Sequence, residues 1–165
     1  NCRFFNSYGP GEVPGQYRNV IPNFIYWSML GKSLPITGTG EETRDFTYVL
    51  DLVQGLLKAA FYDDAVGEAF NLAAGKETSI LNLAEMVNRA SSNSSPINHL
   101  PARKWDTKKR LLASIELAQK LIDYNPIGSF EEGLEYNVSW FKSHWDNIQN
   151  AADFPIGMSS AVRKK

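Results

Sequence analysis

The residues with the clearest potential for binding chemistry lie in the segment GTGEETRDFTYV (38–49), which holds two glycines, a charged run and an arginine. A dinucleotide-binding loop needs three glycines, G-x-G-x-x-G, between a strand and a helix, so that backbone amides reach a pyrophosphate at the helix N-terminus. Here the third glycine is absent, Glu41 and Glu42 would repel an anion, and an extended run follows instead of a helix. The two glycines are therefore predicted to form a turn.

Two arginines, Arg44 and Arg103, are the remaining candidates for holding a phosphate group. A guanidinium can donate two parallel, charge-assisted hydrogen bonds to a diphosphate. The alternative for each arginine is a surface ion pair with a neighbouring carboxylate, and the residue types alone favour that alternative. The neighbouring acids are Glu41, Glu42 and Asp45 for Arg44, and Asp106 for Arg103.

The sequence does not support a nucleophile or a metal as the centre of the chemistry. It contains no G-x-S-x-G motif, and only His99 and His144 could serve as an imidazole base. His144 is expected at the surface of the last helix, and His99 has no partner nearby in the sequence. A zinc site would need more ligands than these histidines and the single cysteine, Cys2, readily supply.

Length and composition predict one globular domain of ordinary size. The chain has 165 residues, of which 43% are hydrophobic and 12% aromatic, so it can bury a core. Its formal charge of -1 favours neither nucleic acid nor an anionic membrane as a partner. Its apolar runs are too short to span a bilayer, and one cysteine cannot form an internal disulfide. These features indicate a reduced, soluble, cytoplasmic setting.

The elements that would position the candidate residues alternate between extended and helical segments, which favours an α/β fold. Ser129 and Glu132 form a capping box ahead of the clearest helix, while Ser114, and Thr78 or Ser79, are expected to cap two others. The strands are few for a complete doubly wound sheet, so we expect the end of a sheet domain plus a smaller, mostly helical region. Extended runs are predicted at 1–6, 34–37, 46–49, 69–73 and 97–100, and helices at 23–30, 50–62, 79–90, 114–122 and 130–148.

Six motifs follow one another along most of the chain: RFFNSYGPGE (3–12), RNVIPNF (18–24), LPITGTGEETRDFTYVLDLV (34–53), AFNLAAG (69–75), RKWDTKKRLLASIELAQKLIDYNP (103–126) and SFEEGL (129–134). In order and spacing they resemble the C-terminal half of the NAD-dependent nucleotide-sugar epimerases and dehydratases. This is the extended short-chain dehydrogenase/reductase group, which includes UDP-glucose 4-epimerase. The set of motifs is specific for that group but not for one reaction within it.

The resemblance implies how the chain is divided. Residues 1–17 would end a Rossmann-like, NAD-binding parallel-sheet domain, and residues 18–150 would be mainly the nucleotide-sugar-binding region, with about 45–75 returning to the sheet domain. Residues 151–165 would form a C-terminal tail. The family's glycine-rich loop and Tyr-x-x-x-Lys pair should precede RFFNSYGP, and neither occurs in this chain. The chain is therefore expected to be a marginally stable fragment that is inactive alone.

The resemblance also assigns roles to ten residues. Asn6 and Arg44 would contact the diphosphate, and the backbone of the strand carrying Pro35 and Thr37 would read the uracil edge. Arg103 would be a second clamp. The residues expected at the nucleotide sugar are Asn6, Asn19, Val20, Pro35, Thr37, Arg44, Arg103 and Asp106, and those expected at the nicotinamide of NAD are Phe4 and Ser7.

The reaction implied by the resemblance is 4-epimerisation of a nucleotide sugar. In this family a tyrosine with a nearby lysine takes the proton of the 4-hydroxyl while C4 passes hydride to NAD, and the 4-keto sugar is then re-reduced, decarboxylated or dehydrated. Alternatives are a UDP-glucuronate decarboxylase, a sugar-nucleotide dehydratase or a non-catalytic nucleotide-sugar binder, and an unrelated interaction domain is least favoured. The full-length protein is expected to be a homodimer that binds a UDP-sugar or another nucleotide-diphosphate sugar.

Overall fold

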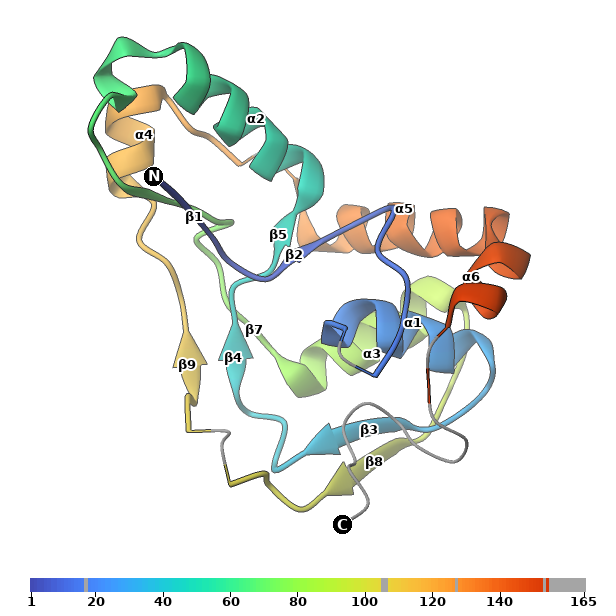
Figure 1. Ribbon diagram of the computed structural model, residues 1–165. Coiled ribbons are helices and arrows are strands. Elements are labelled where there is room, and N and C mark those ends of the chain that lie inside the picture. Colours follow the sequence, from blue (N-terminus) through green and yellow to red (C-terminus); the bar gives the residue numbers. More distant parts are fainter. Residues whose placement is uncertain (17, 105–106, 127, 153, 155–165) are drawn as a thin grey trace.

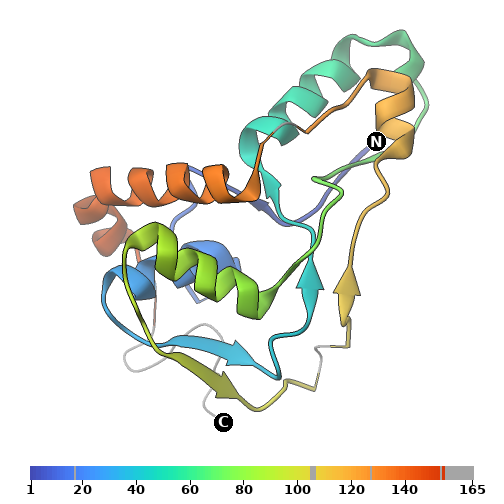
Figure 2. The same ribbon diagram turned by 180° about the vertical axis from the view of Figure 1, so that it is seen from behind.

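The computed structural model of the protein describes residues 1–165 except 17, 105–106, 127, 153 and 155–165. The described chain forms two lobes that are joined by short strands, as Figure 1 and the reverse view in Figure 2 show. Each lobe has its own hydrophobic core. We call them the cavity lobe, which is built around α1, α3 and α5, and the α2 lobe, which is built around α2 and α4.

The cavity lobe contains most of the buried side chains. Its helices pack on one another in the order α1, α3, α5, with α6 at the end of α5 and the strand pair β3–β8 beside α1 and α3. Phe24, Leu34, Leu83 and Phe141 are fully or almost fully buried in this core. The bounds are α1 Val20–Met29, β3 Leu34–Thr37, α3 Ile80–Ser91, β8 Ile97–Leu100, α5 Phe130–Ser143 and α6 Trp145–Ala151.

The α2 lobe is smaller. Its two parallel strands, β1 and β6, pair Cys2 with Phe70 through Phe4 with Leu72, and α2 and α4 lie against them. Leu72, Ile122 and Tyr124 form the centre of its core. The bounds are β1 Cys2–Phe4, α2 Val49–Phe61, the short 3-10 helix η1 Asp63–Ala65, β6 Phe70–Leu72 and α4 Glu116–Ile122.

Five two-residue strands join the lobes. β2 pairs in parallel with β5, and β4 is the middle strand of a small sheet, antiparallel to β7 and parallel to β9. The bounds are β2 Ser7–Tyr8, β4 Thr43–Arg44, β5 Thr47–Tyr48, β7 Thr78–Ser79 and β9 Arg110–Leu111. The alternation of strands and helices confirms the predicted α/β class.

Several local predictions are confirmed. The strands at 34–37 and 97–100 have the predicted bounds. Ser79 and Ser129 are N-caps, since their hydroxyls accept the backbone N–H of Asn82 and Glu132. Gly38 and Gly40 form a turn with positive φ angles of 79° and 81°, which glycine adopts without steric cost.

Several predicted boundaries are wrong, including that of the strand at 46–49, whose last residue, Val49, instead begins α2. α1 begins at Val20 instead of residue 23, so Pro22 lies inside its first turn, where a proline needs no hydrogen-bond partner. The N-cap of α4 is Ile115 without a side-chain cap, not Ser114. The predicted helix 130–148 is two helices, because His144 leaves helical geometry at φ -118° and ψ 22° and separates α5 from α6.

No helix in the described part of the chain combines the length and the apolar composition needed to cross a bilayer. Among the described residues no group of three His, Cys, Asp or Glu side chains is placed to hold a metal ion.

Candidate functional site

A cavity of about 380 Å³ lies in the cavity lobe, between the N-terminal half of α1, the strand β3 and the sheet that contains β4. Seven of the eight residues predicted at the nucleotide sugar line it, although they come from distant parts of the sequence. They are Asn6, Asn19, Val20, Pro35, Thr37, Arg44 and Arg103. The eighth, Asp106, lies outside the described residues.

The two residues predicted at the nicotinamide lie in different places in the structure. Ser7 lines the cavity beside Asn6. Phe4 is not part of the lining; it lies at the carboxyl end of β1 with 54% of its surface exposed. The carboxyl ends of parallel strands are where α/β folds bind dinucleotides, and Phe4 lies at such an end, whereas Ser7 begins β2.

The cavity has an apolar wall and a polar wall. Phe24, Trp27, Ile36 and Ile80 supply the apolar wall, which suits the faces of a planar ring. Asn6, Asn19, Thr37 and the three arginines Arg18, Arg44 and Arg103 supply donors, and Glu42 is the one acidic side chain among the described residues of the lining. Such a division fits an amphipathic ligand that has a flat base at one end and an anionic group at the other.

α1 points its N-terminus into this cavity. Its cap residue, Asn19, makes no side-chain cap bond; instead its Nδ2 donates to Oε1 of Glu12 at 2.8 Å. Burial raises the pKa of Glu12 above its ordinary value, against the opposing effects of Asn19 and Arg18. The first helical residues, Val20 and Ile21, also line the cavity. The partial positive charge of the helix end therefore adds to the charge of the arginines.

Arg44 does not form the surface ion pair that its residue type alone favours. Its Nη1 donates to the carbonyl of Thr43 at 2.7 Å, and among the described residues no carboxylate pairs with it. Glu42 lies beside it in the lining. Asp45 turns its carboxylate to backbone amides, and Glu41 interacts with Thr39. Arg44 thus brings a positive charge to the polar wall.

Asn6 lines the cavity between β1 and β2 and also bonds to the segment that follows Arg44. Its Nδ2 donates to the carbonyl of Asp45 at 3.0 Å, and its own carbonyl accepts the N–H of Thr47 at 3.3 Å. Its φ of 25° is unusual for a residue other than glycine, and asparagine tolerates that region better than most residues do. Its role in the site is therefore partly to hold the backbone beside Arg44.

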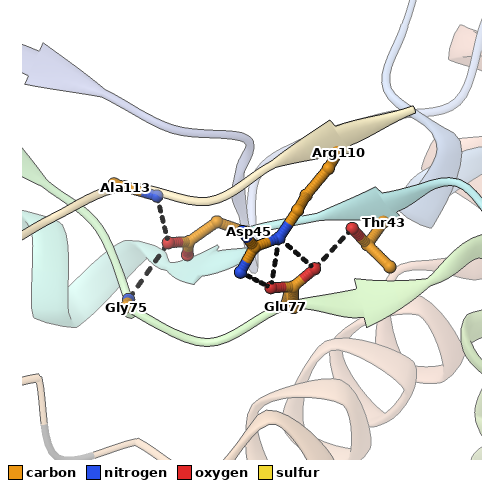
Figure 3. Close-up of polar contacts among 6 residues, drawn as sticks. All are labelled: Thr43, Asp45, Gly75, Glu77, Arg110 and Ala113. Carbon is orange, nitrogen blue, oxygen red and sulfur yellow. Dashed lines mark hydrogen bonds and ion pairs between the residues drawn. The ribbon is translucent and has the colours of Figure 1, made fainter. Parts of the chain in front are cut away.

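The two carboxylates near Arg44 differ in environment (Figure 3). Asp45 is fully buried, and desolvation raises the pKa of its carboxyl despite three backbone N–H donors that act in the opposite direction. Glu77 lies nearer the surface, where hydrogen bonds from Arg110 and Thr43 lower the pKa of its carboxyl. Both groups act on the backbone around Arg44 and neither lines the cavity.

Two tyrosines near the cavity, Tyr8 and Tyr48, are unsuited to removing a proton. Burial raises the pKa of Tyr8, whose hydroxyl donates a hydrogen bond to the carbonyl of Phe130 at 3.4 Å. Burial, reinforced by Tyr136 and Asp51, also raises the pKa of Tyr48. A general base needs a pKa near the working pH. This agrees with the sequence, where Tyr48 lacks a lysine four residues later.

His99 and His144 are both exposed and away from the cavity lining. Nδ1 of His99 lies 3.0 Å from the carbonyl of Gly38, and the ring of His144 stacks on Trp140 at 4.9 Å. The surface position predicted for His144 is confirmed.

Several lining residues were not identified from the sequence. Arg18 immediately precedes Asn19 and Val20, so the motif RNVIPNF contained a signal for it. Trp27 could have been found from its helical spacing of four after Asn23, which also lines the cavity. From the sequence, Glu42 is expected to repel an anion or to pair with Arg44, and not to line a cavity. Phe46 and Ile80 look like ordinary core residues, and only the three-dimensional packing brings them to the cavity.

Comparisons with known proteins give one consistent result. Residues 1–73 match the family described as NAD dependent epimerase/dehydratase. The chain is 32% identical over 145 residues to a UDP-N-acetyl-alpha-D-glucosaminuronate decarboxylase of Bacillus cytotoxicus, covering 85% of this chain and 45% of that protein. It is 34% identical over 152 residues to a UDP-glucuronate 4-epimerase of Thermodesulfobacterium geofontis, covering 90% and 44%. The chain thus spans less than half the length of these curated relatives.

Solved structures agree. An epimerase from Methanothermobacter thermautotrophicus is 50% identical with a TM-score of 0.91, over 93% of this chain and 46% of that one. The UDP-glucuronic acid 4-epimerase of Bacillus cereus, solved with UDP-glucuronic acid and NAD, is 31% identical with a TM-score of 0.79, over 86% and 44%.

Proposed function

Because the chain belongs to the NAD-dependent epimerase/dehydratase family of extended short-chain dehydrogenase/reductase proteins, we propose that its cavity binds a nucleotide-diphosphate sugar. A UDP-sugar is the first choice, since the named relatives act on UDP-sugars. The observation that carries the proposal is the convergence of seven predicted residues, from Asn6 to Arg103, on one cavity.

The proposed roles follow from the two walls. The base would lie against Ile36 and Trp27, with the backbone around Pro35 and Thr37 reading its edge. The diphosphate would lie near the N-terminus of α1, with Arg44 and Arg103 as its cationic partners. A nucleotide diphosphate carries about two negative charges, and two guanidinium groups can neutralise them through paired, charge-assisted hydrogen bonds.

NAD is the family's cofactor, and it would supply the hydride acceptor for oxidation of the sugar. Ser7, in the lining, and Phe4, exposed at the end of β1, fit the edge of a nicotinamide site. We propose that these two residues would contact the nicotinamide side. They would position it beside the cavity in which the chain's own residues hold the sugar nucleotide.

The specific reaction that we propose for the full-length protein is 4-epimerisation through a 4-keto sugar, with decarboxylation of a UDP-glucuronate as the alternative. Curated relatives carry both names, so the family alone does not favour one. We further propose that the full-length protein is a cytoplasmic homodimer divided at about residues 17 and 150, and that its glycine-rich loop and Tyr-x-x-x-Lys pair precede Asn1. Upstream DNA that encodes neither motif would refute the catalytic part of this proposal.

Calorimetric titration with UDP, UDP-glucuronate and UDP-glucose tests the binding proposal. Arg44→Ala and Arg103→Ala should each weaken UDP binding by about tenfold to a hundredfold, because each removes a charged hydrogen-bond partner. Arg89→Ala is the matched control, since Arg89 is exposed on α3 and does not line the cavity. A folded protein that binds none of the three ligands, or that binds UDP equally well in all three variants, would refute the proposal.

Assay of the full-length protein against a panel of nucleotide sugars separates the two reactions. Release of carbon dioxide and a pentose nucleotide from UDP-glucuronate would identify the decarboxylase, and a product of unchanged mass would identify the epimerase.

A further inference from the structure

Arg44 occupies the middle strand of the sheet β7–β4–β9, opposite Thr78 on one side and Leu111 on the other. All three strands are only two residues long, so the backbone ladder alone offers few bonds to fix the direction of this side chain. Successive side chains along a strand point to opposite faces. Thr43 and Asp45, on either side of Arg44, therefore face away from the cavity that Arg44 lines.

Asp45 fastens the backbone immediately after Arg44. Its carboxylate is fully buried and accepts the N–H groups of Ala74 at 3.0 Å, Gly75 at 3.1 Å and Ala113 at 3.3 Å, and Figure 3 shows the last two of these bonds. The first two donors precede β7 and the third follows β9. Its own carbonyl accepts Nδ2 of Asn6 at 3.0 Å. One residue thus joins the Arg44 strand to three other segments.

Glu77 fastens the residue immediately before Arg44. Its Oε1 accepts the hydroxyl of Thr43 at 2.7 Å, and its Oε2 accepts Nε and Nη2 of Arg110 at 2.8 and 2.5 Å. These bonds join β4 to the residue preceding β7 and to the first residue of β9 (Figure 3). The carbonyl of Thr43 in turn accepts Nη1 of Arg44 at 2.7 Å. Thr43, which is hydrogen-bonded to Glu77, therefore contacts the guanidinium directly.

We propose that Asp45 and Glu77 are positioning residues that aim the guanidinium of Arg44 into the cavity, a role that rests on the proposed binding of a diphosphate by Arg44. Neither carboxylate lines the cavity. They act by fixing the two peptide units that flank Arg44, so less side-chain and backbone freedom is lost when the diphosphate binds.

The alternative is that the two carboxylates only stabilise the sheet. The two roles differ in which ligand they affect. Uridine has the base and ribose of UDP but no phosphate, so its affinity should not depend on where the Arg44 side chain points. General damage to the cavity would weaken both ligands, whereas misdirection of Arg44 would weaken UDP alone.

The test measures binding of UDP and uridine to the unchanged protein and to Asp45→Asn and Glu77→Gln, each with Arg44 present and with Arg44→Ala. We expect Asp45→Asn to weaken UDP about five- to tenfold and Glu77→Gln about two- to threefold, while uridine binding changes less than about twofold. With Arg44→Ala already in place, neither change should weaken UDP further. Asp123→Asn is the matched control, because Asp123 is an exposed carboxylate paired with Lys58 in the α2 lobe.

Each outcome decides the question. UDP binding that is unchanged in both variants overturns the positioning role while leaving the proposed function intact. Equal losses for UDP and uridine, or the same loss without Arg44, also overturn it in favour of a structural role. If Asp45→Asn does not fold, Glu77→Gln, which changes a group near the surface, supplies the same comparison. Absence of UDP binding by the unchanged protein overturns the proposed function, and the inference with it.

Discussion

The two lobes differ in how completely each covers its own apolar side chains. In the cavity lobe, helices and strands enclose the core from several sides, and residues such as Phe141 are fully buried. In the α2 lobe, α2 and the turn after it present Leu50, Leu57, Phe61 and Val66 to solvent, and the exposed fractions of Phe61 and Val66 are both 82%. Among the described strands, β1 pairs only with β6. Exposed apolar side chains are therefore concentrated on the α2 lobe.

The cavity lobe therefore has the more completely enclosed core of the two. In the longer relatives, more than half of the chain lies outside the matched part. Marginal stability of the chain on its own stays a prediction, and the exposed side chains of α2 are one reason for it.

The largest expected effect comes from truncating one phenylalanine in each lobe. Phe141→Ala should lower the free energy of unfolding by about 3–5 kcal/mol, because it leaves a cavity in a closed core. Phe61→Ala should change it by less than about 0.5 kcal/mol, because the side chain is already in water. Urea unfolding followed by circular dichroism measures both. Similar losses for the two variants would contradict the contrast between the lobes.

A smaller effect should come from adding a methyl group at a glycine. A Cβ at Gly133 would lie 2.3 Å from the hydroxyl of Tyr8, and one at Gly55 would lie 2.8 Å from Leu72 and Tyr124. Overpacking costs about 1–3 kcal/mol, but at helical positions alanine recovers up to about 1 kcal/mol over glycine. We expect Gly133→Ala, in the cavity lobe, to be the more damaging change.

Thermal melts of both glycine variants, with Glu135→Ala as an exposed control on α5, test this order. A melting temperature that falls further for Gly55→Ala would show that the α2 lobe is the more tightly packed one.

The smallest effect concerns the sheet between the lobes and depends on pH. The pKa of Glu77 is lowered by Arg110 and Thr43, so its stabilising contribution is present above the ordinary glutamate pKa and is lost as the pH falls through the lowered value. The pKa of Asp45 is raised by burial, so its contribution has the opposite sign and is lost as the pH rises through the raised value. Acidification therefore removes the stabilising contribution of Glu77 and restores that of Asp45.

Unfolding measured between about pH 3 and 6 separates the two carboxylates. Glu77→Gln should reduce the loss of stability on acidification, and Asp45→Asn should reduce the loss on raising the pH. If Glu77→Gln leaves the pH profile unchanged, the Glu77–Arg110 pair contributes nothing to joining the lobes.

Sequence reasoning was most successful where the signal is local. The hydroxyls of Ser79 and Ser129 bond to amides three residues away, so each cap can be recognised within a few residues. The strand at 34–37 ends where Gly38 begins a turn.

Sequence reasoning failed where contacts between residues far apart in the sequence determine the structure. The apolar stripe of the last helix continues from Phe141 to Ile148, but the helix is interrupted at His144, whose ring stacks back on Trp140. The lining role of Trp27 depends on a cavity wall formed by residues far away in sequence. The bonds of Asp45 to Ala74 and Ala113 span 29 and 68 positions, and no local pattern reveals them.

The hydrogen bond from Tyr8 to Phe130 joins residues 122 positions apart, which bears on when the site can form during synthesis. The segment Asn6–Tyr8 meets the start of α5 only after the ribosome has added Phe130. Until then, the faces of α1 and α3 that pack against α5 stay uncovered, and closing so long a loop is slow. A nascent chain stalled before α5 should therefore bind chaperones more than one stalled beyond it.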